Sequence, residues 1–189
     1  MKMKVIGLTG TLSSGKEVVR EIIEKNTSSY SVVLSSLLKE DALKKQGISI
    51  TREIRQNLGN ELRKQYGNDV LVKIAVSFMQ KNKDFLIIDG IRSPGEADFL
   101  RGKFGDDFKL IAVDAPQQIR FERMNQRKRE GDPTTWEEFV KLDERDQGKD
   151  EPEYGQQVGK CIEMADIEIQ NDGSLEELQK KVDEVIKQF

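Results

Sequence analysis

The chain has 189 residues, of which 34% are charged and 36% are apolar, and its formal net charge is -3. This composition predicts one sizeable α/β domain; with no basic surplus and no apolar run of about 20 residues, we expect neither a nucleic-acid partner nor a membrane span. There is no histidine and only one cysteine, Cys161, which excludes histidine-based catalytic triads, histidine zinc ligands and an internal disulfide.

A phosphate-binding loop is predicted near the start of the chain. Residues 5–8 read as a buried strand and a helical pattern opens after Lys16, which is the context that this motif requires. Glycines let consecutive backbone amides curl round one anion, the helix start adds its dipole, and Lys16 adds a point charge. The alternative reading is a chance glycine turn. The residues expected to contact the nucleotide are Gly10, Thr11, Leu12, Ser13, Ser14, Gly15, Lys16 and Glu17.

Glu17 departs from the motif, which places Ser or Thr after the lysine so that a hydroxyl can reach Mg²⁺. A carboxylate beside phosphates raises the free energy of binding unless it has a partner. Glu17 can pair with Arg20, three residues along the helix, or it can bind the metal itself. We expect the pair with Arg20, and we expect replacement of Glu17 by Ser or Thr to leave activity equal or higher.

A second short strand is predicted over residues 30–34, and helices are predicted to follow it. A polar helix is expected over residues 37–47, and Thr51 then reads as the N-cap of another. Arg52 and Arg55 lie in the first turn of that helix, where they are either part of a solvated face or contacts for an anion. A further helix follows, with an apolar side at Val70, Ile74 and Phe78.

The clearest internal strand covers residues 84–88 and is apolar throughout, as expected of a parallel strand covered on both faces. Asp89 follows it directly. An acidic residue at the carboxyl end of such a strand, beside a phosphate loop, is where a magnesium-organising aspartate is expected. The alternative for Asp89 is an ordinary Asp-Gly turn.

A strand over residues 108–113 leads into a helix that carries three arginines on one side. Arg120, Arg123 and Arg127 fall at i, i+3 and i+7. Guanidinium groups so placed repel one another unless an anion or carboxylates lie among them. A polyphosphate supplies that anion, and arginine suits bidentate phosphate contacts.

Residues 120–150 predict a small lid, because the stretch is polar and interrupted by glycine and proline. Arg145 lies near its end, before a charged and turn-rich stretch. A weak last strand is expected over residues 165–169. The terminal helix then begins at a capping box formed by Ser174 and Glu177.

In this layout the sequence resembles the nucleoside monophosphate kinase group of P-loop proteins, including archaeal adenylate-kinase-related families and dephospho-coenzyme A kinase. The resemblance covers nearly the whole chain. Residues 89–92 are similar to the Asp-Gly-x-x-Arg region of adenylate kinases, and residues 113–127 to the strand-to-lid passage of dephospho-coenzyme A kinase. Residues 165–178 resemble the closing segment of that kinase, which implies that Asn171 and Gly173 lie in the loop that holds adenine.

The resemblance implies roles for the remaining candidates. A helical insert over about residues 37–82 corresponds in position to the part of these kinases that binds the acceptor. The acceptor is then expected to contact Ser35, Arg52, Arg55 and Arg92. The residues expected to act on the transferring phosphoryl group are Lys16, Asp89, Arg120, Arg123, Arg127 and Arg145. Asp89 is the residue expected to organise the metal.

We therefore predict one α/β domain over residues 1–189, a three-layer α/β/α P-loop fold with a parallel sheet of about five strands and a small helical lid. The expected function is ATP-dependent phosphotransfer to a nucleotide-type acceptor, a nucleoside or deoxynucleoside monophosphate, with ATP and Mg²⁺ as cofactors. The alternatives are dephospho-coenzyme A kinase and a non-catalytic, nucleotide-binding regulatory protein. Because the first strand begins almost at once, we expect no signal peptide and a cytoplasmic protein.

Overall fold

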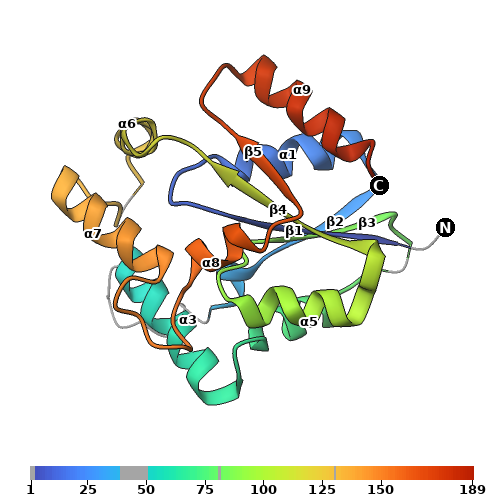
Figure 1. Cartoon of the computed structure of the whole chain (residues 1–189), viewed down its shortest axis with the longest axis horizontal. Coiled ribbons are helices and arrows are strands. Elements are labelled where there is room, and N and C mark those ends of the chain that lie inside the picture. The colour runs from blue at the N-terminus through green and yellow to red at the C-terminus, as the bar shows by residue number, and fades with distance from the viewer. Residues whose placement is uncertain (1–2, 39–50, 81, 130) are drawn as a thin grey trace.

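The computed structural model describes residues 3–38, 51–80, 82–129 and 131–189, and a parallel sheet forms its centre (Figure 1). Within these residues the sheet has five strands in the order β2-β3-β1-β4-β5. The strands are β1 (Lys4–Gly10), β2 (Ser29–Val33), β3 (Phe85–Asp89), β4 (Phe108–Asp114) and β5 (Ile167–Gln170). The predicted five-stranded parallel sheet is confirmed.

Helices cover both faces of the sheet, which gives three layers (Figure 1). The helices on one face are α1 (Lys16–Asn26) and α9 (Leu175–Ile186). Those on the other face are α4 (Val70–Ser77), α5 (Pro94–Phe104) and α8 (Val158–Glu163). Two 3₁₀ helices flank the strands: η1 (Leu34–Leu37) follows β2, and η2 (Gly105–Asp107) precedes β4.

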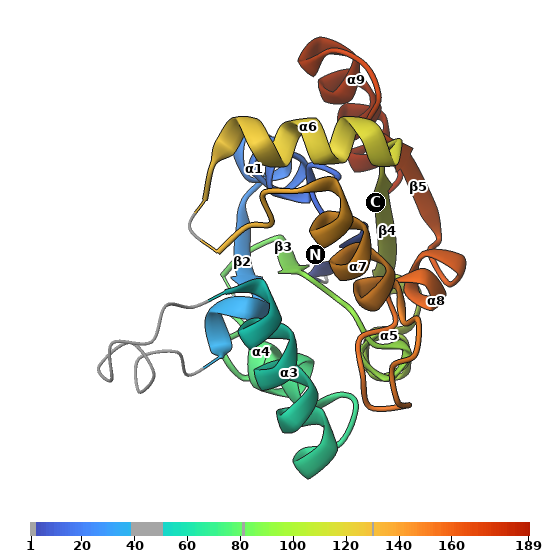
Figure 2. The ribbon, with the colours of Figure 1, turned by 90° about the vertical axis from the view of Figure 1, so that its left-hand side faces the viewer.

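Three further helices lie round the carboxyl ends of the strands. They are α3 (Arg52–Tyr66), α6 (Gln117–Arg127) and α7 (Trp136–Gln147). In Figure 2 this edge faces the viewer, with α6 above, α3 below and α7 between them. The carboxyl edge of a parallel α/β sheet is where ligand sites form.

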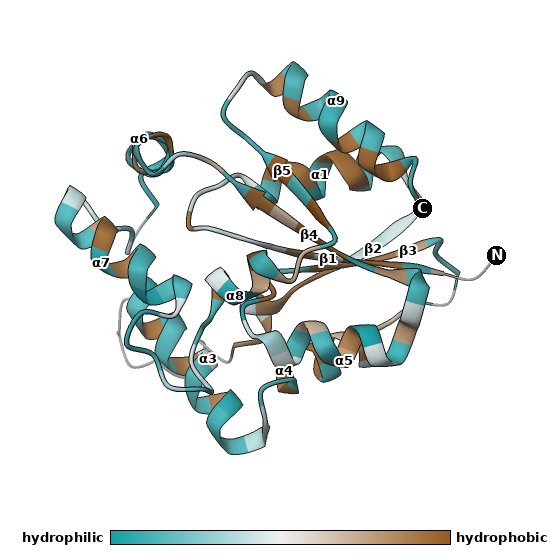
Figure 3. Ribbon diagram, viewed as in Figure 1, coloured by the Kyte–Doolittle hydropathy of each residue, from teal (hydrophilic) through white to brown (hydrophobic). Residues whose placement is uncertain are grey.

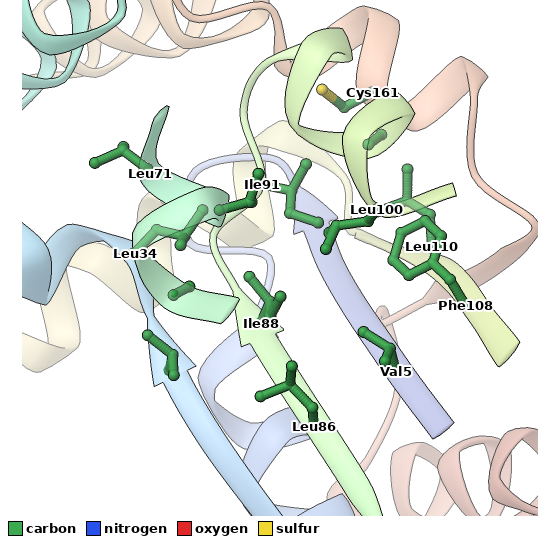
Figure 4. Packing of buried hydrophobic residues seen from close by; sticks show 14 of the residues in the cluster. Val5, Leu34, Leu71, Leu86, Ile88, Ile91, Leu100, Phe108, Leu110 and Cys161 are labelled. Atoms are coloured by element: carbon green, nitrogen blue, oxygen red, sulfur yellow. The ribbon is translucent and has the colours of Figure 1, made fainter. Parts of the chain in front are cut away.

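Alternate residues of the three central strands, β1, β3 and β4, enter two separate cores, one on each face of the sheet. Val5 and Leu110 belong to the core beneath α4, α5 and α8. Their neighbours Ile6 and Ile111 belong to the core beneath α1 and α9. The central strands are therefore hydrophobic over most of their length, whereas α6 and α7 are largely hydrophilic (Figure 3). Figure 4 shows the first core, in which Ile88 of β3 lies among the apolar side chains.

The register of the strands sets the position of the predicted phosphate loop. β1 pairs with β3 on one side, where Leu8 lies opposite Asp89, and with β4 on the other, where Gly10 lies opposite Val113. The loop that follows β1 therefore leaves the sheet between the ends of β3 and β4. This places Asp89 one strand away from the loop.

The predicted apolar side of α4 is wrong. The helix buries Leu71, Val72 and Ala75, whereas Ile74 and Phe78 are 37% and 51% exposed. Seven of the eight helical residues, all but the lysine, are apolar or small, so the sequence of α4 carries little information about which side packs inward.

The structure contains one helix that the sequence did not predict, and one predicted helix lies outside the described residues. The sequence did not predict α8, which has only six residues and two buried positions, Val158 and Cys161. The polar helix predicted over residues 37–47 lies almost entirely outside the described residues. In the part of the chain that the structure describes, no helix has the length and the apolar character to cross a lipid bilayer.

Candidate active site

The loop after β1 has the curled backbone of a phosphate-binding loop. Gly10, Ser13 and Gly15 have positive φ angles of 141°, 62° and 97°. A side chain at Gly10 is impossible without movement of β4, because a Cβ atom there would lie 1.9 Å from the carbonyl oxygen of Val113. The first-turn amides of α1 have no acceptors inside the helix, so the loop and the helix start together form an anion-binding concavity.

Lys16, the first residue of α1, folds back over this loop. Its Nζ donates hydrogen bonds to the carbonyl oxygens of Gly10 (2.5 Å) and Thr11 (3.0 Å). Loss of solvent around the ammonium group lowers its pKa to about 8, and the positive charge of Arg92 acts in the same direction. The ammonium group is therefore held in place by weak neutral acceptors, which the oxygens of a phosphate can replace.

Side chains from the neighbouring strands support the loop from outside. The Asn171 Nδ2 donates to the carbonyl oxygen of Ser14 (2.8 Å), and Arg123 donates to the same oxygen and to Asn171 Oδ1, both at 3.4 Å. Thr11 Oγ1 donates to Asp114 Oδ1 at the end of β4 (2.5 Å). These contacts fix the loop backbone from the side of β4 and β5.

A pocket of about 880 Å³ opens in front of the loop, and cationic side chains dominate its lining. The cations are Lys16, Arg20, Arg52, Arg55, Arg92, Arg123, Arg127 and Arg129. The carboxylates are Glu17, Asp89, Asp132 and Asp146. Eight positive groups against four negative ones make this a pocket for a polyanion.

The sequence-predicted residues divide into two sets. Those that line the pocket are Leu12, Ser13, Ser14, Gly15, Lys16, Glu17, Ser35, Arg52, Arg55, Asp89, Arg92, Arg123 and Arg127. Those that lie outside its lining are Gly10, Thr11, Arg120, Arg145, Asn171 and Gly173. Gly10, Thr11 and Asn171 still shape the loop, whereas Gly173 lies against the side chain of Glu177.

Asp89 stands at the end of β3 and is held by Arg20. Arg20 Nε donates to Asp89 Oδ2 (3.2 Å), and the other end of the guanidinium donates to Glu24 (2.9 Å). Burial would lower the pKa of Arg20, but the two carboxylates outweigh it and raise that pKa above its ordinary value. In the described residues there is no group of three or more acidic side chains that could enclose a metal ion. A single carboxylate such as Asp89 is compatible with Mg²⁺, because this ion usually keeps several waters and is bound by one or two carboxylates together with substrate phosphates.

Asp132 joins α3 to the end of α6 by binding two arginines. Its oxygens accept from Arg52 Nε (2.6 Å) and Arg127 Nε (2.9 Å). Burial alone would raise the pKa of Asp132, but hydrogen bonds from both guanidinium groups hold it below its ordinary range. Arg127 Nη2 is buried and has no hydrogen-bond partner among the described residues. This bridge therefore presents an unsatisfied donor at the pocket that an anion would satisfy.

The turn that carries Arg92 is held by a buried ion pair that the sequence analysis missed. Glu96 Oε2 accepts from the backbone amides of Arg92 (2.8 Å) and Ser93 (3.1 Å), and its Oε1 accepts from Arg63 Nη2 (2.8 Å). From the other side, the amide of Gln157 donates to the carbonyl oxygen of Arg92 (2.7 Å). The Ser-x-x-Glu spacing of Ser93 and Glu96 is a capping-box signal and could have revealed the first half of this arrangement.

Arg120 does not face the transferring group as expected. Its guanidinium is buried and forms two hydrogen bonds to Asp143 of α7, one of them between Nη2 and Oδ2 at 2.9 Å, and a third to the carbonyl oxygen of Leu12 (3.0 Å). The three arginines do share one side of α6, but α7 packs over the first turn of that helix and covers Arg120. Only Arg123 and Arg127 therefore reach the pocket.

Arg145 is also turned away from the pocket. Its Nε donates to Glu151 (2.6 Å) and its Nη2 to Asn57 of α3 (2.7 Å). The charged stretch after α7 returns towards α3, and Arg145 links the two. Its neighbour in the sequence, Asp146, lines the pocket instead.

The expected pair between Glu17 and Arg20 is wrong. Arg20 is taken by Asp89 and Glu24, and the Glu17 Oε2 instead accepts from Arg129 Nη2 at 2.6 Å. The two side chains are 49% and 55% exposed. The pair connects the start of α1 with the segment after α6 at the mouth of the pocket.

Buried oxygen atoms without partners add to the polar character of the pocket. Among the described residues they include Ser13 Oγ, Ser14 Oγ, Gln56 Oε1 and Gln156 Oε1, all from residues of the pocket lining. Unsatisfied buried polar groups are uncommon in folded proteins and often indicate a missing ligand or water. No sequence motif pointed to Gln56 or Gln156, because both lie on segments that converge only in the fold.

Comparison with known proteins decides the family. Residues 6–150 match the family model described as AAA domain. A UPF0200 protein of Thermococcus gammatolerans is 35% identical over 189 residues, which is 98% of this chain and 95% of that protein. The chain contains an AAA domain and belongs to the UPF0200 family. Another relative, the UPF0200/UPF0201 protein of Archaeoglobus fulgidus, is 31% identical, and the chain spans 56% of its length.

Solved structures with the same architecture show that this UPF0200 protein has the fold of P-loop kinases. The shikimate kinase of Aquifex aeolicus has a TM-score of 0.52 at 19% identity, with 97% of this chain and 96% of that chain covered. A gluconokinase of Sinorhizobium meliloti has a TM-score of 0.56 at 14% identity, with 98% and 97% covered. The narrower grouping with nucleoside monophosphate kinases and dephospho-coenzyme A kinase stays a prediction.

Proposed function

We propose that this UPF0200 protein is an ATP-dependent phosphotransferase that acts on an anionic acceptor of nucleotide type. The observation that carries the proposal is the surplus of cationic side chains in one pocket directly in front of the phosphate loop. Phosphoryl transfer depends on positioning and on neutralisation of charge more than on an acid or a base. A chain without histidine is suited to that chemistry.

The donor nucleotide would lie with its phosphates on the loop. The amides of the loop and of the first turn of α1 would bind the β- and γ-phosphates, and Lys16 would exchange its two carbonyl acceptors for phosphate oxygens. The buried hydroxyls of Ser13 and Ser14, which lack partners among the described residues, add two donors. Arg123 and Arg127 would close over the phosphates from α6.

Mg²⁺ would be held by Asp89 together with phosphate oxygens and water, and it would neutralise charge on the phosphates. Glu17, which stands where the motif has a hydroxyl residue, is engaged by Arg129 at the mouth of the pocket.

The acceptor would lie on the side of α3. Arg52 and Arg92 come from α3 and from the turn after β3, and Ser35 and Arg55 complete this part of the lining. We infer a nucleoside monophosphate or dephospho-coenzyme A as acceptor, because either brings an anion of the kind that arginine side chains bind. That the similar solved structures include a shikimate kinase and a gluconokinase supports kinase chemistry.

The decisive experiment is a transfer assay combined with calorimetry of ADP binding. ATP and Mg²⁺ are incubated with a panel of nucleoside monophosphates and dephospho-coenzyme A, and phosphorylated acceptor is measured. Lys16→Ala should abolish transfer and weaken ADP binding by about 10- to 100-fold, since a hydrogen bond to a charged group contributes about 1.5–3 kcal/mol. Lys25→Ala, on an exposed position of the same helix, is the matched control.

Equal ADP affinity in wild type and Lys16→Ala would overturn the phosphate-loop assignment. ADP binding without transfer to any acceptor would overturn the kinase proposal and favour a nucleotide-binding regulatory protein instead.

A further inference from the structure

We propose that the phosphoryl group goes to an alcohol hydroxyl of the anionic acceptor and that Asp146 accepts the proton of this hydroxyl. The inference rests on the proposed phosphotransfer and names the kind of group that receives the phosphate. It concerns a residue to which the motifs in the sequence assign no role.

Asp146 differs from the other carboxylates of the pocket in how it is held. The other three are bound by arginine nitrogens at 2.6–3.2 Å, and they are Glu17, Asp89 and Asp132. Around Asp146 the nearest cationic nitrogen that the structure records is Arg92 Nε at 3.8 Å, and Gln56 Nε2 donates to it at 3.4 Å. Both distances are long for such contacts. Asp146 is thus a buried carboxylate, 6% exposed, in loose contact with its neighbours.

The position of Asp146 is close to the expected site of transfer. It lies in the last turn of α7 and lines the same pocket as the phosphate loop. Its charge acts on Lys16, as does that of Asp89. Asp89 is bound to Arg20 and is the expected metal ligand, so Asp146 is the carboxylate near Lys16 that is available to the acceptor.

The charge of Asp146 discriminates between two kinds of acceptor group. A nucleoside monophosphate receives the phosphoryl group on a phosphate oxygen, which is already anionic and needs no base. A buried carboxylate beside that oxygen would repel it. An alcohol keeps its proton at neutral pH, so a carboxylate within hydrogen-bond reach orients the hydroxyl and receives its proton. The Asp146 carboxylate therefore favours an alcohol, and disfavours a phosphate, as the group that attacks the γ-phosphorus.

The step is balanced without another reactant. The hydroxyl oxygen of the acceptor forms a bond to the γ-phosphorus, and the bond from that phosphorus to the β–γ bridging oxygen breaks. ADP leaves with the electron pair of the broken bond, and the proton of the hydroxyl moves to a carboxylate oxygen of Asp146 and then to water. Arginines that line the same pocket bind the anionic part of the acceptor.

The test identifies the product by ³¹P NMR and compares two matched variants. Wild-type protein is incubated with ATP, Mg²⁺ and one acceptor at a time: AMP, CMP, dephospho-coenzyme A, shikimate or gluconate. A transfer to a hydroxyl gives a phosphomonoester resonance, and a transfer to a phosphate gives a phosphoanhydride resonance. Because the nucleotides carry both groups, the spectrum itself shows which one reacted.

The variant is Asp146→Asn, which keeps the size of the side chain and removes its ability to take a proton. We expect kcat to fall by about 100-fold or more, with the KM of the acceptor and the affinity for ADP within about twofold of wild type. The control is Glu137→Gln, the same chemical change at an exposed position of α7, and it should behave as wild type. A role confined to balancing the charge of Arg92 would change KM and leave kcat.

Each outcome decides. A phosphomonoester product together with the loss of kcat supports the inference. A phosphoanhydride product overturns the hydroxyl assignment, and unchanged kcat in Asp146→Asn overturns the role of Asp146 as proton acceptor; both leave the kinase proposal standing. ADP binding without transfer to any of the five acceptors overturns the kinase proposal, and this inference with it.

Discussion

At the scale of single residues, Lys16 shows how the site is prepared for an anion. Its ammonium group is partly withdrawn from water and hydrogen-bonded to two carbonyl oxygens of the loop, and Arg92 adds a like charge. Burial and the charge of Arg92 favour the neutral amine, and they outweigh the hydrogen bonds and the charges of Asp89 and Asp146, which favour the ammonium form, so the pKa falls from 10.5 to about 8. A bound polyphosphate reverses the balance, because its charge favours the ammonium form.

We therefore predict that ADP binding takes up a proton above pH 8. Lys16 has a pKa of about 8 in the free protein and a higher one in the complex, so its contribution to binding is fully present below pH 8. That contribution is lost as the pH rises through the pKa of the complex. Calorimetry of ADP binding at pH 9, in two buffers of different ionisation enthalpy, measures the uptake.

The control for this prediction is Lys16→Arg, whose guanidinium stays protonated throughout. The variant should bind ADP with the same apparent enthalpy in both buffers. Equal enthalpies for the wild type would contradict the prediction.

The pair of Glu17 and Arg129 leads to a second prediction at this scale. Both side chains are about half exposed, so their ion pair contributes only about 0.2–1 kcal/mol to stability. Glu17→Ser removes a carboxylate from the mouth of a pocket built for anions. We expect a melting temperature within about 2 °C of wild type and an equal or higher kcat/KM for ATP, measured in the transfer assay.

Arg129→Gln is the informative partner variant for Glu17, because it leaves the carboxylate unpaired at the mouth and should raise the KM of ATP. If Glu17→Ser instead lowers activity and weakens the dependence on Mg²⁺, Glu17 binds the metal and the pairing seen here is not the functional one.

At the scale of elements, the seam between α6 and α7 is built round a buried ion pair. Arg120 of α6 is 4% exposed, and Asp143 of α7 is fully buried. Gln117 and Gln147 donate further hydrogen bonds to Asp143, at 3.1 Å and 3.0 Å. Phe139 packs beneath the pair, with the Arg120 guanidinium carbon 5.6 Å from its ring centroid. The seam therefore holds the two helices at fixed positions behind the phosphate loop.

The prediction for this seam separates a structural arginine from one that faces the pocket. Arg120→Ala leaves the Asp143 carboxylate buried without its cation, which should lower the free energy of unfolding by about 3–5 kcal/mol. Arg123→Ala should leave stability nearly unchanged and lower kcat, since Arg123 lines the pocket. Urea unfolding and the transfer assay measure the two effects.

The double variant Arg120→Met with Asp143→Leu is the control for that prediction. Replacement of both charges by apolar groups removes the unpaired carboxylate, so most of the lost stability should return. A cost below about 1 kcal/mol for Arg120→Ala would show that the buried pair does not hold the seam.

At the scale of the whole molecule, charge is distributed unevenly. The chain carries a net charge of -3, yet the pocket lining contains twice as many cations as carboxylates. The remaining surface is therefore more acidic than the net charge suggests. A positive concavity in an acidic surface concentrates anionic ligands at the site and repels them elsewhere.

The sheet and the phosphate loop could be predicted because both depend on local sequence. Strands buried on both faces read as apolar runs, and residues 85–89 and 108–114 are such runs. The loop is recognisable from the spacing between Gly10 and Lys16 and from the strand and helix that flank it. Each of these signals lies within about a dozen residues of chain.

The partners of charged side chains could not be predicted, because they come from distant segments. Arg120 and Asp143 are 23 residues apart, and Glu17 and Arg129 are 112 apart. Helical spacing gives the side of α6 on which its arginines stand, but only the packing of α7 decides which of them is covered. Asp146 went unnoticed for the same reason, since nothing in its own neighbourhood sets it apart from the acidic residues around it.

The aromatic side chains of the seam have an experimental use. Trp136, the only tryptophan of the chain, lies at the start of α7 and is 36% exposed. Its ring centroid is 5.3 Å from that of Phe121 on α6 and 5.7 Å from that of Phe139. Intrinsic fluorescence excited at the red edge of the absorption band therefore arises from this one location. A titration with nucleotide would report movement of α7 against α6 in the unlabelled protein, with no background from the rest of the molecule.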